Sequence, residues 1–330
     1  MAKKISVIGS GSWGVALAYL LNNNGHDVKI WSYSQEEADM INNEKKCKFL
    51  PEHTLPDNLP CYTSLEEAIK DTEIILIVTP SMAIRSTLNN MKPFVKDNQV
   101  FLLCSKGMEP DTQKVFTEVI EEIYPNNKVA ALSGPSHAEE VIKLLPTAVV
   151  IASKDEELLT MLQDTFMCEH FRVYTNTDIL GVELGGSLKN IIALCCGMAH
   201  GLGFGDNALA ALITRGLLEI SRIGIAAGAD MQTFYGLTGL GDLFVTCSSV
   251  HSRNRKCGIL LGQGLTLEEA KKQVGMVVEG VNAVEGAYVL VKKYDIYAPI
   301  ITEIYDILHN NKSVKEATLN LMTRGKKTEF

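Results

Sequence analysis

Short apolar runs alternate with helix-length segments through the first half of the chain. The runs predict strands at Ile5–Gly9, Val28–Trp31, Ile74–Thr79, Val100–Ser105, Val129–Ser133 and Ala148–Ala152. The segments between them predict helices at Trp13–Asn23, from Gln35 onward, at Thr112–Tyr124 and at Glu156–Phe166. Strands that are apolar along their whole length and separated by helices are typical of a parallel sheet with both faces covered. The first half is therefore predicted to be a doubly wound α/β domain.

The pattern changes after about Thr177, where the strand signals stop. Long stretches rich in Ala, Gly and Leu predict helices at Ile179–Met198, Ala208–Ala227, Thr266–Val274, Asn282–Tyr294 and Ile300–Leu308. Helical segments of this length, with no strand pattern between them, indicate an all-α domain. We therefore predict two domains, an α/β domain over residues 1–180 and an all-α domain over residues 181–330.

The composition is that of an ordinary globular protein, and its charge limits the partners. The chain of 330 residues is long enough for two buried cores, and 46% of its residues are hydrophobic and 21% charged. A formal net charge of −8 argues against a nucleic acid or an anionic membrane surface as partner, because both require a basic face. An anionic substrate must therefore be held by a few local cations.

The sequence shows no targeting, membrane or metal signal. The N-terminal residues run directly into the first predicted strand, and no apolar run of about 18 residues follows. We therefore expect a cytoplasmic protein without membrane insertion. The eight cysteines contain no CxxC pair and the seven histidines show no zinc-ligand spacing, so we expect reduced thiols and no metal site.

A glycine-rich turn follows the first predicted strand. Gly9-Ser10-Gly11-Ser12-Trp13-Gly14 matches GxGxxG and opens the first predicted helix, which is the context that a dinucleotide site requires. In this pattern the first Gly permits a tight turn, the second lets the backbone approach a pyrophosphate, and the third lets helix and strand pack closely. The helix N-terminus then offers free N–H groups to the phosphates. The turn predicts a Rossmann-type domain with NAD or NADP as cofactor; a plain strand–helix turn is the alternative.

The residues that would select between NAD and NADP give no clear signal. An NAD-binding fold usually has an acidic residue at the tip of the second strand, where it bonds the ribose hydroxyls. This chain has Trp31-Ser32-Tyr33-Ser34 at that place. Because no carboxylate there repels a 2′-phosphate and no arginine binds one, the sequence favours use of both cofactors, or NADP held by hydroxyl and backbone groups.

Two lysines stand where core packing does not explain them. Lys106 follows the fourth predicted strand, and open α/β sheets bind ligands at the carboxyl ends of their strands. Lys189 lies in the apolar segment Ile179–Met198, where burial favours the neutral amine and suits a general acid/base near neutral pH. Gly185 and Gly186, on the same helix face, would leave room beside it for a ligand. The alternatives are a solvated loop lysine for the first, and a lysine that reaches solvent at a helix edge for the second.

A third polar stretch combines glycines, an acid and several donors. Gly236–Asp242 reads as a glycine-rich loop that ends in a carboxylate, and Ser252-Arg253-Asn254-Arg255 follows it. A guanidinium matches phosphate oxygens in a bidentate way, so this stretch is a candidate phosphate site. A polar surface turn is the alternative, and the spacing alone does not reject it.

At these segments the chain resembles bacterial NAD(P)-dependent glycerol-3-phosphate dehydrogenases along nearly its whole length. The resemblance rests on Gly9–Gly14, Ser133-Gly134-Pro135-Ser136-His137-Ala138, Gly185-Gly186-Ser187-Leu188-Lys189-Asn190, Ile213-Thr214-Arg215-Gly216-Leu217, Gly239–Asp242, Ser252–Arg255 and Val277-Val278-Glu279-Gly280. Seven motifs in family order are far more specific than GxGxxG alone. The resemblance implies an oxidoreductase that interconverts dihydroxyacetone phosphate and sn-glycerol 3-phosphate by hydride transfer with NADH or NADPH, feeding glycerophospholipid synthesis.

The resemblance also implies a role for each matching position. Lys189 would donate or accept the proton at the C2 oxygen of the substrate. The substrate would be bound by Lys106, Gly134, Ser136, Lys189, Asp242, Ser252, Arg253 and Asn254. The cofactor would be bound by Gly9, Gly11, Ser12, Trp13, Gly14, Tyr33, Lys106, Ala138, Arg253, Val277 and Glu279. Tyr33 stands where relatives often have His or Arg, which leaves the cofactor preference open; the implied assembly is a homodimer.

Two other functions are compatible with parts of the sequence, and a third is disfavoured. A related two-domain hydroxyacid dehydrogenase would act on a non-phosphorylated substrate. A non-catalytic redox sensor would bind the dinucleotide without needing Lys189. A short-chain dehydrogenase would use a YxxxK pair, which Tyr124…Lys128 and Tyr288…Lys292 match. The first of these pairs spans a proline and cannot form one helical face, and the second lies far from the sheet half of the chain.

Overall fold

The computed structural model describes residues 2–326 and 328–329, and the chain forms two compact units. The first unit comprises Met1–Glu109 and Lys114–Glu183, and the second comprises Pro110–Gln113 and Leu184–Phe330. The division after residue 183 falls inside helix α8, Ile179–Gly201, whereas the sequence pattern put it at residue 180. Each unit is described by itself below.

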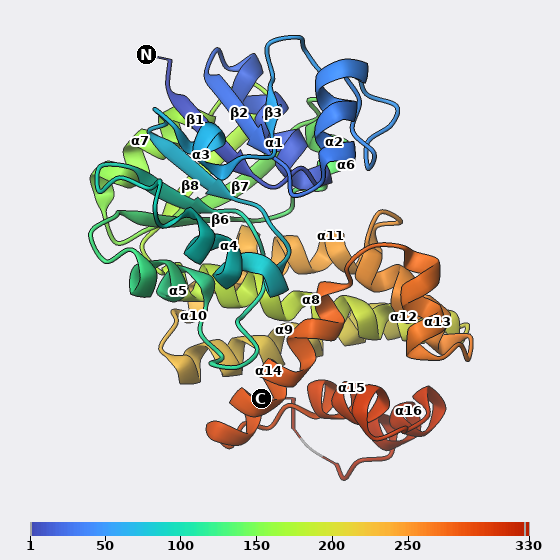
Figure 1. Ribbon diagram of the computed structural model, residues 1–330. Helices are drawn as coiled ribbons and strands as arrows, with labels where there is room; N and C mark the ends of the chain where they lie inside the picture. Colours follow the sequence, from blue (N-terminus) through green and yellow to red (C-terminus); the bar gives the residue numbers. More distant parts are fainter. Residues whose placement is uncertain (1, 327, 330) are drawn as a thin grey trace. The chain divides into compact units, whose positions relative to one another are not determined.

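An eight-stranded sheet forms the centre of the first unit (Figure 1). In spatial order its strands are β3 Cys61–Tyr62, β2 Asp27–Trp31, β1 Lys4–Ile8, β4 Ile74–Ile77, β5 Val100–Leu103, β6 Val129–Ser133, β7 Thr147–Ala152 and β8 Phe171–Asn176. Neighbouring strands are parallel except for β6 and β7, which pair antiparallel. The predicted Rossmann-type parallel sheet is therefore confirmed for the strands from β3 to β6, while β7 and β8 run the other way.

The reversal follows from the short connection between β6 and β7. A parallel crossover must carry the chain back across a face of the sheet, and a five-residue strand is about 17 Å long. The only helix in this connection is α6, Ala138–Val141, which spans about 6 Å. The chain therefore turns at the edge where β6 ends and begins β7 there.

Helices cover both faces of the sheet. One face packs against α1 Ser12–Asn23, α6 and α7 Glu156–Phe166, and the other against α3 Leu65–Ile69, α4 Ile84–Met91 and α5 Phe116–Ile123. Because side chains alternate along a strand, Ile74 and Leu76 enter the first of these layers and Ile75 and Ile77 the second. The remaining short elements of this unit are α2 Gln35–Asp39, η1 Met40–Glu44 and η2 Ser81–Ala83.

Helix α5 begins later than the sequence predicted. The expected helix Thr112–Tyr124 loses its first turn, because Val115 pairs in a β-bridge with Met108 and its N–H donates to the Glu118 carboxylate at 3.1 Å. A side chain that satisfies a backbone N–H just before the first helical residue fixes the helix start at that point. The prediction was therefore wrong for the N-terminal end of this helix.

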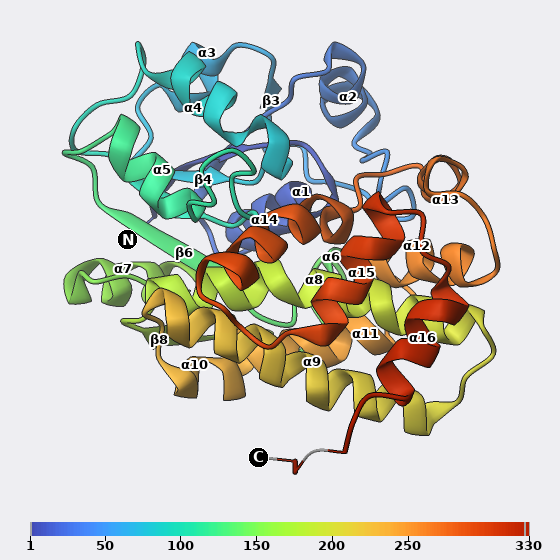
Figure 2. The ribbon, with the colours of Figure 1, turned by 90° about the horizontal axis from the view of Figure 1, so that it is seen from below.

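The second unit is helical throughout the residues that the structure describes. Beyond α8 its elements are α9 Asp206–Ala227, α10 Met231–Tyr235, η3 Leu237–Gly241, α11 Asp242–Ser248, α12 Arg253–Gly262, α13 Leu267–Val274, α14 Glu279–Lys293, α15 Pro299–His309 and α16 Val314–Met322. In Figure 2 the orange-to-red helices pack in succession, α14 on α15 and α15 on α16. The predicted all-α domain is confirmed. The loop predicted at Gly236–Asp242 is wrong, because that stretch forms the helical turn η3 and the start of α11.

Helices α8 and α12 cross with their backbones in contact. A Cβ atom on Gly197 would lie 2.2 Å from the carbonyl oxygen of Arg255, and one on Gly258 would lie 2.0 Å from that of Leu194. Only glycine fits at such an approach, so the crossing point is fixed by these two residues. The crossing holds the first turn of α12 beside the middle of α8.

Helix α8 is long and apolar enough, by its composition and its 23 residues, to cross a membrane. It is the one helix of the described residues that meets this test, and 89% of its most apolar window is buried inside the protein. Such burial is typical of a core helix, which satisfies the same criterion of length and composition as a membrane span.

Candidate active site

The glycine-rich turn joins β1 to α1, as predicted, and leaves no space for side chains at two of its glycines. Gly9 has a φ of +133°, and a Cβ atom on it would lie 2.8 Å from the carbonyl oxygen of Val78. A Cβ atom on Gly14 would lie 2.0 Å from the carbonyl oxygen of Gly9. A larger residue at Gly9 would clash with the chain just after β4, and one at Gly14 would push the helix away from the turn.

The same turn is open where a phosphate would approach. Gly11 is the N-cap of α1 and has no side chain to satisfy the first N–H groups of the helix, and a Cβ atom on it would meet nothing within 4 Å. Thr79, two residues after β4, lies next to Gly9 and has a buried hydroxyl oxygen without a hydrogen-bond partner. Open space, free helix N–H groups and an unsatisfied hydroxyl fit a dinucleotide pyrophosphate.

Five more of the predicted residues gather at the edge of the sheet where β5 and β6 end. The Lys106 ammonium and the Ser136 hydroxyl both donate to the carbonyl oxygen of Gly134, each at 3.0 Å. The Trp13 indole N–H donates to the carbonyl oxygen of Cys104 at 3.1 Å. Because the strands from β3 to β6 are parallel, these contacts lie at the same edge of the sheet as the glycine-rich turn. Ala138 begins helix α6 at this edge and is buried.

The structure brings a carboxylate to this turn that the sequence argument missed. The Ser10 hydroxyl lies 2.6 Å from the Glu37 carboxylate and 2.8 Å from the hydroxyl of Ser32. Glu37 lies in the first turn of α2, beyond the strand tip at which an acidic residue was sought. Tyr33, the side chain at the tip itself, is 91% exposed. The expectation that no carboxylate lies near the end of the second strand was therefore wrong.

In the second unit Lys189 is buried and ion-paired. Only 5% of this residue is exposed, and its ammonium donates to Asp242 Oδ1 at 2.5 Å and to Thr246 Oγ1 at 2.6 Å. An adjacent carboxylate favours the charged ammonium, which opposes the effect of burial. Thr246 escaped the sequence argument, although Asp242 and Thr246 stand four residues apart on one helix face. That spacing carried no signal, because Asp242 was predicted to end a loop and no helix was predicted at Thr246.

The space that was expected beside Lys189 is filled in part by the chain itself. A Cβ atom on Gly185 would lie 3.1 Å from the carbonyl oxygen of Thr238, so this glycine admits the turn η3. The expectation that Gly185 leaves room for a ligand was wrong. Ser187, two residues before Lys189, has a buried hydroxyl without a hydrogen-bond partner.

The donors predicted around Arg253 are either exposed to solvent or already used within the fold. Arg253 is the first residue of α12 and its side chain is exposed. Ser252 is the N-cap of α12, where its hydroxyl accepts the N–H of Arg255 at 3.2 Å. A hydroxyl at this place contributes about 1 kcal/mol to the stability of a helix. Of the three consecutive residues Ser252, Arg253 and Asn254, only Arg253 has an exposed side chain that can reach an anion.

Asn254 joins three helices. Its amide nitrogen donates to Asn190 Oδ1 of α8 at 2.9 Å, and its amide oxygen accepts the N–H of Gly280 in α14 at 2.8 Å. Glu279 is the first residue of α14, and Val277 precedes the N-cap of that helix. The predicted substrate and cofactor residues on α8, α12 and α14 are thus fixed relative to one another.

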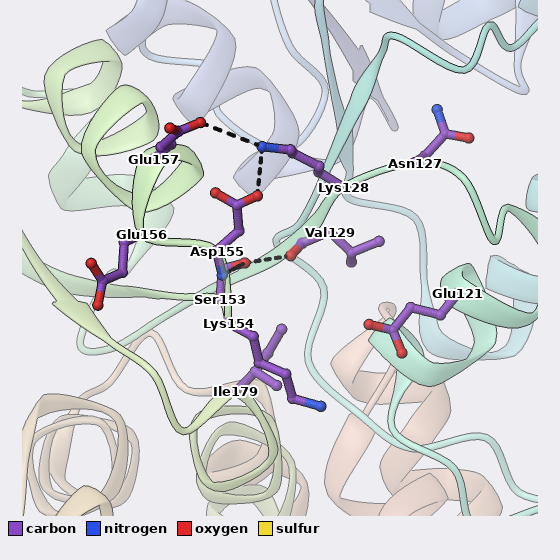
Figure 3. A pocket seen from close by; sticks show the side chains of 10 residues that line it. All are labelled: Glu121, Asn127, Lys128, Val129, Ser153, Lys154, Asp155, Glu156, Glu157 and Ile179. Carbon is purple, nitrogen blue, oxygen red and sulfur yellow. Dashed lines mark hydrogen bonds and ion pairs between the residues drawn. The ribbon is translucent and has the colours of Figure 1, made fainter.

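A cavity of about 490 Å³ in the first unit lies elsewhere (Figure 3). It is lined by Glu121, Asn127, Lys128, Val129, Ser153, Lys154, Asp155, Glu156, Glu157 and Ile179. Lys128, before the start of β6, is paired with Asp155 at 2.5 Å and with Glu157 at 3.9 Å. Ligands of open α/β sheets bind at the carboxyl ends of the strands, and the start of β6 lies at the other edge. This cavity is therefore not the dinucleotide site.

Neither YxxxK pair forms a catalytic arrangement. The Tyr124 hydroxyl donates to the carbonyl oxygen of Leu88, and burial raises the pKa of Tyr124. Lys128 forms the ion pairs with Asp155 and Glu157 described above. The ring of Tyr288 stacks on that of Tyr305 with a centroid distance of 3.8 Å, and the ammonium of Lys292 lies over the ring of Tyr288. Among the described residues, no group of three or more His, Cys, Asp or Glu side chains is arranged to hold a metal ion.

A Rossmann-type unit with a dinucleotide turn and a helical unit with a buried Lys–Asp pair define a two-domain NAD(P)-dependent dehydrogenase. The family model for the N-terminus of NAD-dependent glycerol-3-phosphate dehydrogenase matches residues 4–159, and the model for its C-terminus matches residues 178–319. The chain belongs to the NAD-dependent glycerol-3-phosphate dehydrogenase family.

Bacterial relatives match nearly the whole chain. A protein of Fusobacterium nucleatum named glycerol-3-phosphate dehydrogenase (NAD(P)+) is 52% identical over 99% of this chain and 98% of its own length. A protein of the same name from Agathobacter rectalis is 50% identical over 99% of this chain and 97% of its own length. The crystal structure of glycerol-3-phosphate dehydrogenase from Coxiella burnetii is 37% identical, with a TM-score of 0.95 over 98% of this chain and 99% of that one.

Proposed function

We propose that the chain is an enzyme that interconverts dihydroxyacetone phosphate and sn-glycerol 3-phosphate with NADH or NADPH, and thereby feeds glycerophospholipid synthesis. The family membership and the names of the bacterial relatives support this reaction. The observation that carries the catalytic assignment is the buried Lys189, held between Asp242 and Thr246. A buried lysine that is fixed by two partners is suited to proton transfer at a defined atom.

The first unit is proposed to bind the dinucleotide. Gly9, Gly11 and Gly14 shape the turn, and the N–H groups of Ser12 and Trp13 at the start of α1 would face the pyrophosphate. Lys106, Gly134, Ser136 and Ala138 would lie along the same sheet edge. The nicotinamide, when bound, supplies or accepts the hydride at C2 of the substrate.

In the second unit Lys189 is proposed to move the proton. In the direction of reduction it donates a proton to the C2 oxygen as that oxygen gains negative charge, and in the reverse direction it accepts the proton from the hydroxyl. Asp242 keeps the ammonium charged before the transfer, and Thr246 fixes the direction of the Nζ atom. Because both partners lie on α11, the position of Lys189 depends on the packing of α8 against α11.

The phosphate of the substrate is assigned to the exposed Arg253. The net charge of −8 repels an anionic substrate at long range, so the attraction must come from a local cation. The guanidinium offers a fork of N–H donors to two phosphate oxygens, and binding energy there holds the carbonyl in place for reaction. Ser252 and Asn254 position the first turn of α12 that carries Arg253.

A homodimer in the cytoplasm is proposed as the assembly and location. Four large apolar side chains on α10, η3 and α11 are exposed: Met231, Tyr235, Leu240 and Phe244. These three elements pack side by side, so the four side chains belong to one region of the second unit. Apolar regions of this kind often mark interfaces. Sedimentation equilibrium of the full chain measures the assembly directly.

The test of the proposed function is a Lys189→Met variant assayed with dihydroxyacetone phosphate and each reduced cofactor. We expect kcat to fall by roughly 10²–10⁴, the range for a positioned acid/base, while the Kd for NADH stays unchanged. Lys256→Met, at an exposed position of α12, is the matched control and should leave both values unchanged. A near-normal kcat in Lys189→Met would remove the assignment of Lys189. Absence of turnover in the wild type would contradict the assignment of dihydroxyacetone phosphate as the substrate.

A further inference from the structure

We propose that Glu37 sets the cofactor preference of this enzyme toward NADH, by placing a carboxylate where the end of β2 would otherwise admit the 2′-phosphate of NADPH. The inference rests on the proposed function in one respect, namely that the first unit binds a nicotinamide dinucleotide. It reverses the expectation from the strand tip alone, which favoured both cofactors or NADP.

The position of Glu37 follows from its contacts with the glycine-rich turn. Ser10 lies between Gly9 and Gly11, and its hydroxyl is 2.6 Å from Glu37 Oε2. In this fold the adenosine ribose binds beside the turn, at the carboxyl end of the second strand. Ser32 is the first residue after β2, and its hydroxyl is 2.8 Å from that of Ser10. The Glu37 carboxylate thus accepts a hydrogen bond from the glycine-rich turn, one of the two segments that flank the ribose, and Ser32 of the other segment lies against the same Ser10 hydroxyl.

The local hydrogen bonds hold the carboxylate in place. Ser10 has a single hydroxyl proton, and a charged acceptor forms the stronger bond, so Ser10 donates to Glu37. Ser32 is fully buried and its hydroxyl donates to the carbonyl oxygen of Ser34 at 3.0 Å. The hydroxyl of Ser34 in turn accepts the N–H of Glu37 as the N-cap of α2. Glu37 is therefore tied to the ribose end through both its side chain and its backbone.

The lysines on either side of Cys47, which lies against the turn, are engaged elsewhere or exposed. Cys47 lies against the turn, with its sulfur 3.9 Å from the carbonyl oxygen of Ser10, and lysines surround it in sequence. Lys45 lies 3.7 Å from the Asp57 carboxylate, and Lys46 donates to the carbonyl oxygen of Pro51 at 3.2 Å. Lys48 is exposed and is the cation against which the proposal must be tested.

The experiment measures the binding of NADH and NADPH to the full chain by cofactor fluorescence, without substrate. We expect the wild type to bind NADH more tightly than NADPH, and Glu37→Gln to reduce that preference by about tenfold through tighter NADPH binding. That is the size expected for one carboxylate a few ångström from a doubly charged phosphate. Glutamine still accepts the bond from Ser10, and a thermal unfolding curve without cofactor confirms that the variant folds. Glu36→Gln, an exposed neighbour on the same helix, is the matched control and should leave the ratio unchanged.

A second pair of probes isolates the adenosine end of the cofactor. Adenosine 2′,5′-bisphosphate and adenosine 5′-monophosphate differ by the 2′-phosphate alone, and Glu37→Gln should strengthen the binding of the first and not of the second. An unchanged NADH/NADPH ratio in Glu37→Gln would overturn the proposal. So would a wild-type preference for NADPH that Lys48→Ala removes, because a lysine would then hold the 2′-phosphate.

The failure of this inference and that of the proposed function are distinguishable. Normal turnover of dihydroxyacetone phosphate together with an unchanged cofactor ratio contradicts only the role of Glu37. The expected ratio without any turnover contradicts the substrate assignment and leaves the role of Glu37 standing.

Discussion

Replacing Glu183 with Gln should remove much of the pH dependence of the stability of the first unit. Glu183 is buried; one of its carboxyl oxygens accepts the N–H of Thr117, in the first turn of α5, and the other forms a hydrogen bond with the Thr117 hydroxyl. Burial raises the pKa of Glu183 to about 8, and the hydrogen bonds from Thr117 offset only part of that effect. The Glu183 carboxyl thus satisfies an N–H at the start of α5, as a capping residue would. At neutral pH it does so in its protonated, neutral form.

The sign of the effect follows from proton binding in the two states. The pKa of an unperturbed glutamate is 4.5, so between 4.5 and about 8 the folded protein keeps a proton that the unfolded chain releases. The free energy of unfolding therefore falls as pH rises through this window and levels off above it. At about 1.36 kcal/mol per pH unit, the loss is on the order of 5 kcal/mol as an upper limit. Burial also raises the pKa of Glu219, in the second unit, to about 7, so the wild type alone does not isolate Glu183.

The assay compares Glu183→Gln with the wild type in urea at pH 5, 7 and 9, followed by circular dichroism. Glutamine imitates the neutral acid, since its oxygen accepts the N–H of Thr117 and its amide donates to the hydroxyl. We expect equal stabilities at pH 5 and a variant that is several kcal/mol more stable at pH 9. Glu121→Gln, exposed on the same helix α5, should show no such trend. A difference between variant and wild type that is the same at pH 5 and pH 9 would refute the reasoning.

Two further predictions concern substrate and cofactor. Arg253→Ala should lower kcat/KM for dihydroxyacetone phosphate by a factor that corresponds to about 2–3 kcal/mol, and kcat/KM for dihydroxyacetone much less, while the control Lys256→Ala should change neither. Equal losses on both substrates would show that the phosphate binds elsewhere. Gly14→Ala should weaken NADH binding at least tenfold in a fluorescence titration, because its Cβ atom would lie 2.0 Å from the carbonyl oxygen of Gly9; an unchanged Kd would contradict this packing.

The parts of the fold that were predicted correctly are those in which one local pattern decides the structure. The six predicted strands are mostly buried and apolar, with Ser6 and Lys29 as the polar residues inside the first two, so each one was recognised. Strand β8 was missed because Arg172 and Tyr174 are exposed and alternate with buried residues. Gly239 suggested a loop, yet it is a glycine because a Cβ atom there would lie 2.0 Å from the carbonyl oxygen of Phe234. A glycine required by close packing and a glycine required by a turn look the same in a sequence.

The candidate site shows the same limit for polar residues. The apolar surroundings of Lys189 indicate that burying its charge is costly, and that cost is visible in the sequence. The groups that offset the cost lie more than fifty residues further along the chain, and only the packing of α8 against α11 brings Asp242 and Thr246 to the ammonium. Glu37 likewise reaches the glycine-rich turn only through the placement of α2 after β2. A sequence therefore shows which polar group needs a partner, whereas the tertiary structure decides which partner it has.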